Sequence, residues 1–274
     1  NLLTIAHGTT GFADECAPSK TPGSELLLLR DQVEAGWLVA MSDYEGLGTP
    51  GRHPYLVGES EGRGVIDAIV AAEQLPGADA GDRLAIAGYS QGGHGALWAN
   101  QVAEQWAPEL DVVGTFAGAP ATEMQVILRA APAGFQFLIV AGFAAAYPEA
   151  DPATFLTPLA EPRLDAVDDG CARDVFGAVS DLPRGQVVQP TAFDEGPWAD
   201  LADQNDPGNV ATEDPILVVH SEADEVVPIT LSKFLLDRMC AVDQVVERRI
   251  LTDGAGHGAA VARCRDTLGE RGAV

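Results

Sequence analysis

A serine between glycines, in the segment Gly88-Tyr89-Ser90-Gln91-Gly92, is the feature that most constrains the fold of this chain. The run Arg83–Ala87 before it predicts a short buried strand, and the run Gly93–Trp106 after it predicts a helix. A serine at a sharp turn from strand to helix is a nucleophile elbow, in which glycines let two chain segments approach and the strained turn exposes the serine Oγ. The sequence therefore predicts a reactive serine at the end of a strand.

Strand-like and helical runs alternate along most of the chain, which predicts an α/β fold with a mostly parallel sheet. The predicted strands are residues 2–6, 37–42, 83–87, 112–116, 215–220 and 245–251, and the predicted helices are residues 25–35, 61–75, 93–106, 230–240 and 259–267. The alternation breaks between residues 121 and 209, where the chain is helical and interrupted by prolines. We therefore expect a core of residues 1–120 and 210–274, with a helical cap or lid, residues 121–209, inserted between the fourth and fifth strands.

The charge of the chain limits its partners. It contains 41 acidic and 16 basic residues, a formal net charge of −25. No basic patch is available to neutralise phosphates, so nucleic acid is not expected as a partner and anionic lipid headgroups are disfavoured. Adaptation to high salt and a GC-rich genome both explain such a surface. No apolar stretch reaches the ~18 residues that span a bilayer, so no stable membrane insertion is expected.

An acid and a histidine follow Ser90 in the chain order of the α/β-hydrolase triad. Asp224 lies in the loop after the fifth predicted strand, and His257 lies in a glycine-rich turn after the sixth. The carboxyl ends of parallel strands meet at one edge of a sheet, so the three side chains are expected to converge there. His257 would accept the proton of Ser90, and Asp224 would hold the correct tautomer of the imidazole.

Other residues compete for these two roles. Asp224 is alternatively a turn residue, with Glu222 and Glu225 as rival acids in the same loop. The other histidines are assigned by their surroundings: His7 to the glycine loop after the first strand, His53 to an exposed loop, His94 to packing or to the pocket wall on the elbow helix, and His220 to the core at a strand end.

An acyl-transfer enzyme also needs donors for the developing oxyanion. The backbone N–H of Gln91 is one candidate. The other is expected from the loop after the first strand, where Gly8 lets the backbone approach a substrate and Thr9 adds a hydroxyl; a tight corner without such a role is the alternative. Asp43 and Tyr44 are candidate substrate-binding residues, and for Asp43 loop capping is equally compatible with the sequence.

The run from Ala133 to Ala146 is almost entirely apolar. It contains more large side chains than one helix face can bury against a single layer. We expect Phe135, Ile139 and Phe143 to line an acyl site. The alternative is a helix buried in the core of the cap itself.

Four widely spaced cysteines form no C-x-x-C pair, so no metal site is expected. Their even number fits two disulfides in a secreted protein, and four buried thiols in a cytoplasmic enzyme are the alternative. The chain opens on a strand-like run without a signal peptide, so we expect that further residues precede it.

These motifs together resemble the secretory lipase family. The similarity covers the segments Gly36–Trp37, Asp43–Gly46, Gly58–Gly62, the elbow with its helix and the following residues 107–114, and His220 with Asp224–Pro228. The resemblance implies an α/β-hydrolase fold with a helical cap, secretion, and hydrolysis of carboxylic esters without a cofactor. It assigns Ser90, Asp224 and His257 to the triad, and Gln91 with the first-strand loop to the oxyanion hole.

The segment Cys16-Ala17-Pro18-Ser19 matches a segment of the family whose cysteine bonds to the cap. We therefore expect the disulfides Cys16–Cys171 and Cys240–Cys264. The first-strand loop differs from the acidic loop of the family, and the chain ends soon after His257, so long-chain triglyceride specificity is not implied.

The resemblance and the motifs predict a secreted serine carboxylesterase or lipase that acts on a small-molecule or lipid ester. An acyltransferase or a serine peptidase on the same fold, and a non-catalytic hydrolase-like binding domain, are the alternatives. The sequence makes no prediction of the oligomeric state.

Overall fold

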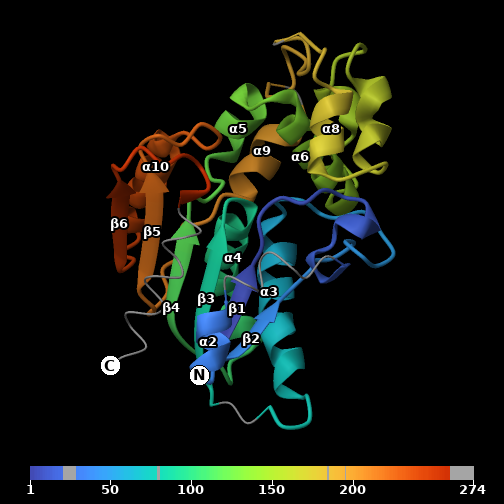
Figure 1. Cartoon of the computed structure of the whole chain (residues 1–274). Helices are drawn as coiled ribbons and strands as arrows, with labels where there is room; N and C mark the ends of the chain where they lie inside the picture. The colour runs from blue at the N-terminus through green and yellow to red at the C-terminus, as the bar shows by residue number, and fades with distance from the viewer. Residues whose placement is uncertain (21–28, 79–80, 184, 195, 260–274) are drawn as a thin grey trace.

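A six-stranded, fully parallel sheet in the order β2-β1-β3-β4-β5-β6 organises the molecule (Figure 1). The computed structural model describes residues 1–20, 29–78, 81–183, 185–194 and 196–259. The strands are β1 (Leu2–Ala6), β2 (Leu38–Met41), β3 (Arg83–Tyr89), β4 (Asp111–Gly118), β5 (Ile216–Ser221) and β6 (Val246–Leu251). All six strands predicted from the sequence are therefore confirmed.

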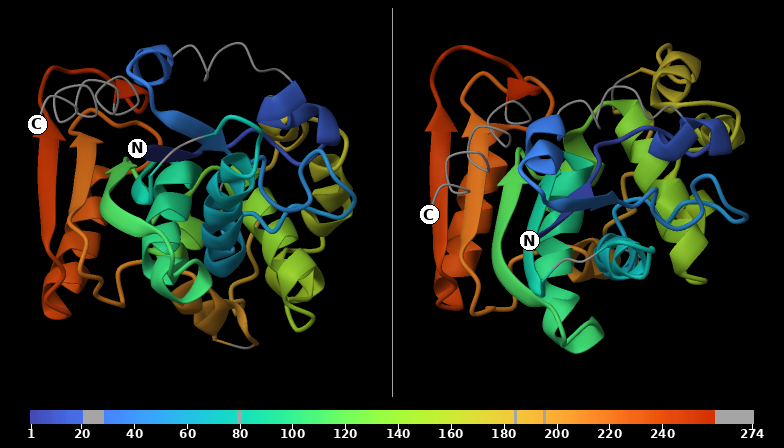
Figure 2. Two further views of the ribbon diagram at one scale, coloured as in Figure 1. Left: turned by 90° about the horizontal axis from the view of Figure 1, so that it is seen from below. Right: turned by 60° about the horizontal axis from the view of Figure 1, so that its bottom comes forward.

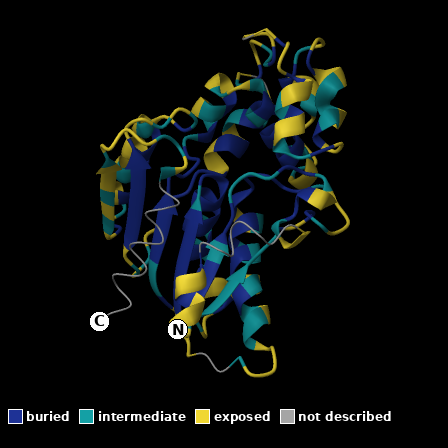
Figure 3. Ribbon diagram, in the orientation of Figure 1, coloured by how far each residue is buried: buried dark blue, intermediate teal, exposed yellow. Residues whose placement is uncertain are grey.

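The central strands are apolar on both faces because helices and loops cover both sides of the sheet. Side chains alternate along β3. Leu84 and Ile86 belong to the core shared with helices α3 (Gly58–Glu73) and α4 (Gln91–Trp106), whereas Ala85 and Ala87 belong to the core of the opposite face. Figure 3 shows the resulting buried centre of the sheet. Because both faces of the sheet are buried, the register of the strands is fixed. The carboxyl ends of the parallel strands then lie along one edge of the sheet.

Four helices accompany the sheet in the described residues: α2 (Arg30–Glu34), α3 (Gly58–Glu73), α4 (Gln91–Trp106) and α10 (Ile229–Ala241). Figure 2 shows α2 on the opposite side of the sheet from α3 and α4. Helices α3 and α4 approach closely at Gly62, which has no Cβ. A Cβ at this position would lie 2.8 Å from a backbone atom of Trp98. This contact fixes the helix that follows Ser90 against the sheet.

Five further α-helices lie between β4 and β5 in the described part of the chain: α5 (Met124–Ala130), α6 (Ala133–Ala146), α7 (Pro152–Phe155), α8 (Ala172–Ala178) and α9 (Trp198–Gln204). Short 3-10 helices are η1 (Asp14–Cys16), η2 (Pro18–Lys20) and η3 (Glu161–Val167). The inserted helices gather beyond the carboxyl ends of the strands (Figure 1). They enclose a hydrophobic core of their own, centred on α6.

Helix boundaries differ from the predicted ones where distant contacts decide them. Helix α3 begins at Gly58, before the predicted residue 61, because the Gly58 N–H donates to Asn205 Oδ1 at 2.8 Å. Helix α4 begins at Gln91 directly after Ser90. Most of the predicted helix 259–267 and residues 25–28 of the predicted helix 25–35 lie outside the described residues. Among the described residues, no helix has the length and apolar character to cross a membrane.

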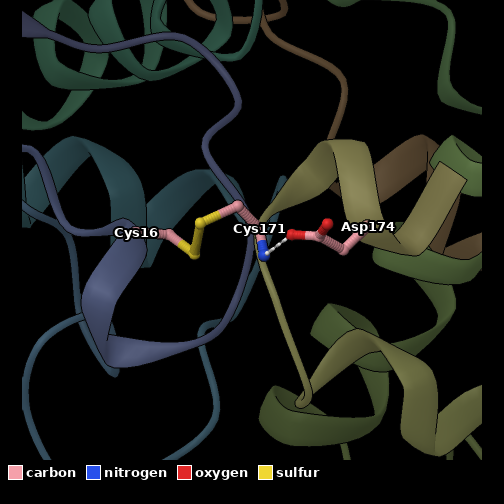
Figure 4. The surroundings of a disulfide bond; sticks show 3 residues. All are labelled: Cys16, Cys171 and Asp174. Atoms are coloured by element: carbon pink, nitrogen blue, oxygen red, sulfur yellow. Dashed lines mark hydrogen bonds between the residues drawn. A yellow bond between two sulfur atoms is a disulfide. The ribbon is translucent and has the colours of Figure 1, made fainter. Parts of the chain in front are cut away.

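A disulfide between Cys16 and Cys171 joins the loop after β1 to the start of α8 (Figure 4). The first expected pair of cysteines is thereby confirmed. An antiparallel bridge between Gly11 and Cys171 lies beside it. Cys240 forms no disulfide within the described part of the chain, and its expected partner Cys264 lies outside that part, so the second pair stays a prediction.

Candidate active site

Ser90 occupies a strained turn between β3 and α4. Its backbone has φ 58° and ψ −119°, a region that non-glycine residues rarely adopt and that costs about 1–3 kcal/mol. Glycines make the turn possible: a Cβ on Gly88 would lie 1.9 Å from Gly92 O, and a Cβ on Gly92 would lie 1.9 Å from Ala6 O. The Ser90 N–H donates to Gly118 O at 2.9 Å, which anchors the turn to the neighbouring strand.

Ser90, His257 and Asp224 come together at the rim of the sheet. Ser90 Oγ lies 3.0 Å from His257 Nε2, and His257 Nδ1 lies 2.7 Å from Asp224 Oδ2. A carboxylate only accepts hydrogen bonds, so Nδ1 carries the proton and Nε2 is free to accept the serine proton. This is the arrangement that activates a serine nucleophile.

The loop that carries His257 is held from two sides. Glu225 Oε2 accepts the backbone N–H of His257 at 2.9 Å, and Ser221 Oγ donates to Ala255 O. Glu225, a rival of Asp224 in the sequence, therefore contacts the backbone of the histidine, while Asp224 contacts its ring.

The Asp224 carboxylate is surrounded by donors. Burial alone would raise its pKa, but hydrogen bonds from two histidine rings, His220 and His257, and from two backbone N–H groups outweigh burial and hold the pKa well below its usual range. Tyr89 packs against the His257 ring, with the ring centroids 4.8 Å apart. Burial, together with the negative charges of Asp224 and Glu225, raises the pKa of Tyr89, so its hydroxyl stays protonated.

The expected oxyanion donors lie beside the elbow. Gln91 is the first residue of α4, where helix N–H groups lack partners within the helix. A Cβ on Gly8 would lie 3.5 Å from the Tyr89 ring, so the first-strand loop passes close to the elbow. Thr9 Oγ1 lies 2.7 Å from the hydroxyl of Tyr55, which is buried. The first-strand loop therefore lies beside the residue that precedes Ser90.

A model of the secretory lipase family matches residues 17–249 of this chain. The chain belongs to the secretory lipase family. "Secreted triacylglycerol lipase LIP4" of Malassezia furfur is 28% identical over 263 residues, which cover 89% of this chain and 49% of that protein. "Probable inactive lipase MT1628" of Mycobacterium tuberculosis is 32% identical over 164 residues, which cover 54% of this chain and 36% of that protein. The chain thus spans less than half the length of these relatives.

The closed-state structure of Candida antarctica lipase A resembles this one with a TM-score of 0.77 at 23% identity, covering 94% of this chain and 66% of that chain. At this identity the likeness concerns the fold, which is that of the α/β-hydrolases, as the sequence predicts.

In this member of the secretory lipase family, a buried polar cluster lies behind the elbow. Glu61 of α3 is fully buried, and its Oε1 accepts the Leu56 N–H at 2.9 Å and Gln91 Nε2 at 2.8 Å. Its Oε2 lies 2.7 Å from His94 Nδ1. The Glu61 carboxylate thereby fixes the side chain of Gln91, the residue after Ser90. Glu61 is not among the residues that the sequence analysis identified. A signal existed: Glu61 precedes Val65 and Ile69 at intervals of four residues, on the buried face of α3.

The prediction of an exposed His53 is wrong. Only 1% of His53 is exposed, and its Nε2 lies 2.9 Å from Gln91 Nε2. Since an amide NH₂ only donates, His53 Nε2 accepts and Nδ1 donates to Glu45 O at 2.9 Å. Burial lowers the pKa of His53 to about 4, against the smaller opposing effect of Glu61. His94 is buried, as is His220 at the end of β5.

The candidate substrate residues in the loop after β2 have structural contacts. Asp43 accepts hydrogen bonds from the backbone N–H and the hydroxyl of Ser19, which is the loop-capping alternative. Tyr44 is buried; its hydroxyl donates to His7 O at 3.0 Å, and its ring stacks on His53.

The candidate acyl-site residues lie on α6. Ile139 and Phe143 have no exposed surface and belong to the core of the inserted helices. Phe135 packs edge-on against Phe176, with the ring centroids 4.7 Å apart. A cavity of about 420 Å³ beside α6 is lined by Gly134, Gln136 and Phe176, among other residues, but by none of the three candidates. These contacts fit the alternative, a helix in the core of the insertion.

Among the described residues, no group of three or more His, Cys, Asp or Glu side chains is arranged to hold a metal ion.

Proposed function

We propose that this protein is a serine carboxylesterase or lipase, which hydrolyses carboxylic esters through an acyl-enzyme on Ser90. The observation that carries the proposal is the continuous hydrogen-bonded line from Ser90 Oγ through His257 to Asp224, at 3.0 and 2.7 Å, on a nucleophile elbow. Membership of the secretory lipase family supports the reaction class.

Each residue has a distinct step in the proposed reaction. His257 Nε2 takes the proton from Ser90 Oγ as the oxygen attacks the ester carbonyl. The Gln91 N–H, with Gly8 or Thr9 from the facing loop, stabilises the oxyanion. The intermediate collapses, the alcohol leaves with the proton from His257, and a water activated by the same imidazole releases the acid. Asp224 stabilises the imidazolium in both halves of the cycle.

The proposed substrate is an uncharged ester, of either a small molecule or a lipid. We assign residues 1–120 and 210–274 to the catalytic core and residues 121–209 to a cap at the rim that carries Ser90. The family name and the Cys16–Cys171 disulfide support a secreted protein, since such bonds persist in oxidising compartments.

A non-catalytic binding domain is the second candidate function, because one relative carries the word "inactive" in its name. The geometry at Ser90 argues against it for this chain. A fluorophosphonate probe separates the two: covalent labelling of Ser90 requires an activated nucleophile, whereas a binding domain stays unlabelled. Transfer of the acyl group to an added alcohol would reveal an acyltransferase instead, and cleavage of a peptide amide would reveal a peptidase.

The replacement Ser90→Ala tests the proposal directly. We expect a loss of about a millionfold in kcat for p-nitrophenyl esters, because the triad residues act as a unit. Asp224→Asn should cost about ten-thousandfold through the wrong imidazole tautomer. Glu222→Gln is the matched control and should cost far less. A series of acyl chain lengths, measured beside a triglyceride emulsion, separates an esterase from a lipase. A purified Ser90→Ala protein that keeps a tenth of the turnover would contradict the assignment.

A further inference from the structure

His220 lies behind the proposed triad and has no role in the reaction described above. It occupies the end of β5 and has no exposed surface. Its Nε2 lies 3.1 Å from Asp224 Oδ2 and 2.9 Å from Val227 O. Both partners are acceptors, so the geometry requires a proton on Nε2 that is shared between them.

The surroundings of the other ring nitrogen, Nδ1, explain why the His220 imidazole acts as a neutral donor. Nδ1 is buried and has no hydrogen-bond partner among the described residues. A second proton on this nitrogen would be buried without an acceptor, which is costly. His220 therefore presents an N–H dipole to Asp224 and adds no charge to the site.

Asp224 Oδ2 consequently lies between two imidazoles. One is His257, whose Nδ1 is 2.7 Å away, and the other is His220. The second carboxylate oxygen, Oδ1, accepts two backbone N–H groups, from Val226 at 2.9 Å and Val227 at 2.8 Å. Three of the four contacts come from β5 and the following loop, so they fix the carboxylate, and the fourth is the catalytic partner that it orients.

We propose that His220 is a positioning residue for the reaction: its Nε2–H holds Asp224 Oδ2 in the place where that oxygen orients His257. This inference rests on the proposed function, because it assigns His220 a role in the activity of Ser90. It predicts that the donor on His220, rather than the volume of the ring, matters for turnover.

The donor can be removed or kept in matched variants. His220→Leu removes it, and His220→Gln places an amide N–H near the position of Nε2. We expect His220→Leu to lower kcat by about 10- to 100-fold with little change in KM, the size expected for a hydrogen bond to a charged group. His220→Gln should recover most of this loss. A Gln variant as impaired as the Leu variant would overturn the proposal.

The pH profile separates positioning from a purely structural role. The titratable groups around Asp224 are His220, His257, Tyr89 and Glu225. His220→Leu removes one hydrogen-bond donor from the Asp224 carboxylate, so the carboxylate stabilises the imidazolium of His257 more strongly. The acid limb of kcat/KM should therefore move to higher pH in this variant. Val218→Ala, a buried change on the same strand, should lower the melting temperature without moving that limb. An unmoved limb in a folded His220→Leu protein contradicts the proposal.

A measurement on the unaltered protein decides the case even if His220→Leu fails to fold. In ¹H–¹⁵N spectra of the histidine rings, His220 should be the tautomer with its proton on Nε2. A proton on Nδ1 would overturn the proposal. This test needs no activity, so it stands apart from the Ser90→Ala result: a protein that hydrolyses no ester refutes the proposed function, and the wrong tautomer refutes the role of His220.

Discussion

Gln91 serves the proposed site with both its main chain and its side chain. Its N–H follows the nucleophile and is the proposed oxyanion donor, while its side-chain amide donates to Glu61 Oε1 at 2.8 Å and to His53 Nε2 at 2.9 Å. These contacts restrict the start of α4 from behind. Preorganised donors stabilise an oxyanion because they need no reorganisation during the reaction. The buried cluster therefore fixes the residue that carries the proposed oxyanion donor.

His53, one of the two histidines of this cluster, makes the fold sensitive to acid. Burial lowers the pKa of His53 to about 4, whereas an unfolded histidine has a pKa of about 6.5. The unfolded state therefore binds the proton first, and stability that is complete above pH 6.5 is lost as the pH falls toward 4. Over this interval the loss is about 3 kcal/mol. We expect urea unfolding at pH 7 and pH 4.5 to show it, and His53→Gln to reduce the difference by about 2 kcal/mol or more.

A control at the same place is Tyr55→Phe, since the rings of Tyr55 and His53 are 6.0 Å apart. Burial raises the pKa of Tyr55, so the phenol does not titrate in the acid range and its removal should cost the same free energy at both pH values. If His53→Gln kept the pH dependence of the unaltered protein, the acid sensitivity would have another origin.

At the scale of elements, local pattern predicts most of this fold, and long-range partners decide the rest. The strands could be predicted because β1, β3 and β5 are apolar runs closed by turn residues. The convergence of Ser90, Asp224 and His257 could be predicted because all three follow strands in a known order. The burial of Glu61 and His53 could not be predicted in the same way. A carboxylate and an imidazole are buried only when partners from other segments satisfy them. Their side-chain partners here, Gln91 and His94, lie 30 or more residues away in the sequence.

The two connections between the sheet and the inserted helices meet at one arginine of α10. Arg238 pairs with Glu123, which precedes α5, and with Asp206, which follows α9, the latter at 3.4 Å. Asp206 also accepts the Met124 N–H at 3.0 Å. Burial raises the pKa of both carboxyl groups, and Arg238 opposes this effect. The arginine therefore compensates two partly buried charges where the insertion leaves and rejoins the sheet.

Arg238→Gln should destabilise the protein by about 2–4 kcal/mol at pH 7, between the values for exposed and fully buried pairs. The cost should shrink as the pH falls, because Glu123 and Asp206, whose folded pKa values are already raised, then lose their charge. Urea unfolding at pH 7 and pH 5 measures both effects. Lys233→Gln on the same helix removes an exposed pair with Asp237 and should change stability by less than about 0.5 kcal/mol. Equal effects of the two substitutions would refute the role of Arg238.

At the scale of the whole molecule, several contacts attach the inserted helices to the rest of the chain, and two of them lie at separate places. Arg238 holds their two ends near α10, and the Cys16–Cys171 disulfide holds α8 against the loop after β1. The Ala172 N–H also donates to Thr10 O at 2.8 Å beside the disulfide. The proposed oxyanion loop, residues 8–10, therefore lies between the strand that positions it and a covalent link to the insertion, so reduction of the bond should affect both stability and activity.

The double variant Cys16→Ser, Cys171→Ser isolates this link. The two cysteines are 155 residues apart, and closing a loop of this length stabilises the folded state by about 5 kcal/mol in the chain-entropy model. We expect a loss approaching this value in urea unfolding at neutral pH, and dithiothreitol should produce at least this loss in the unaltered protein. Dithiothreitol added to the double variant then tests the expected Cys240–Cys264 bond, whose presence would cause a further loss. A double variant that unfolds at the same urea concentration as the unaltered protein would show that the hydrogen bonds beside the disulfide suffice to hold the insertion.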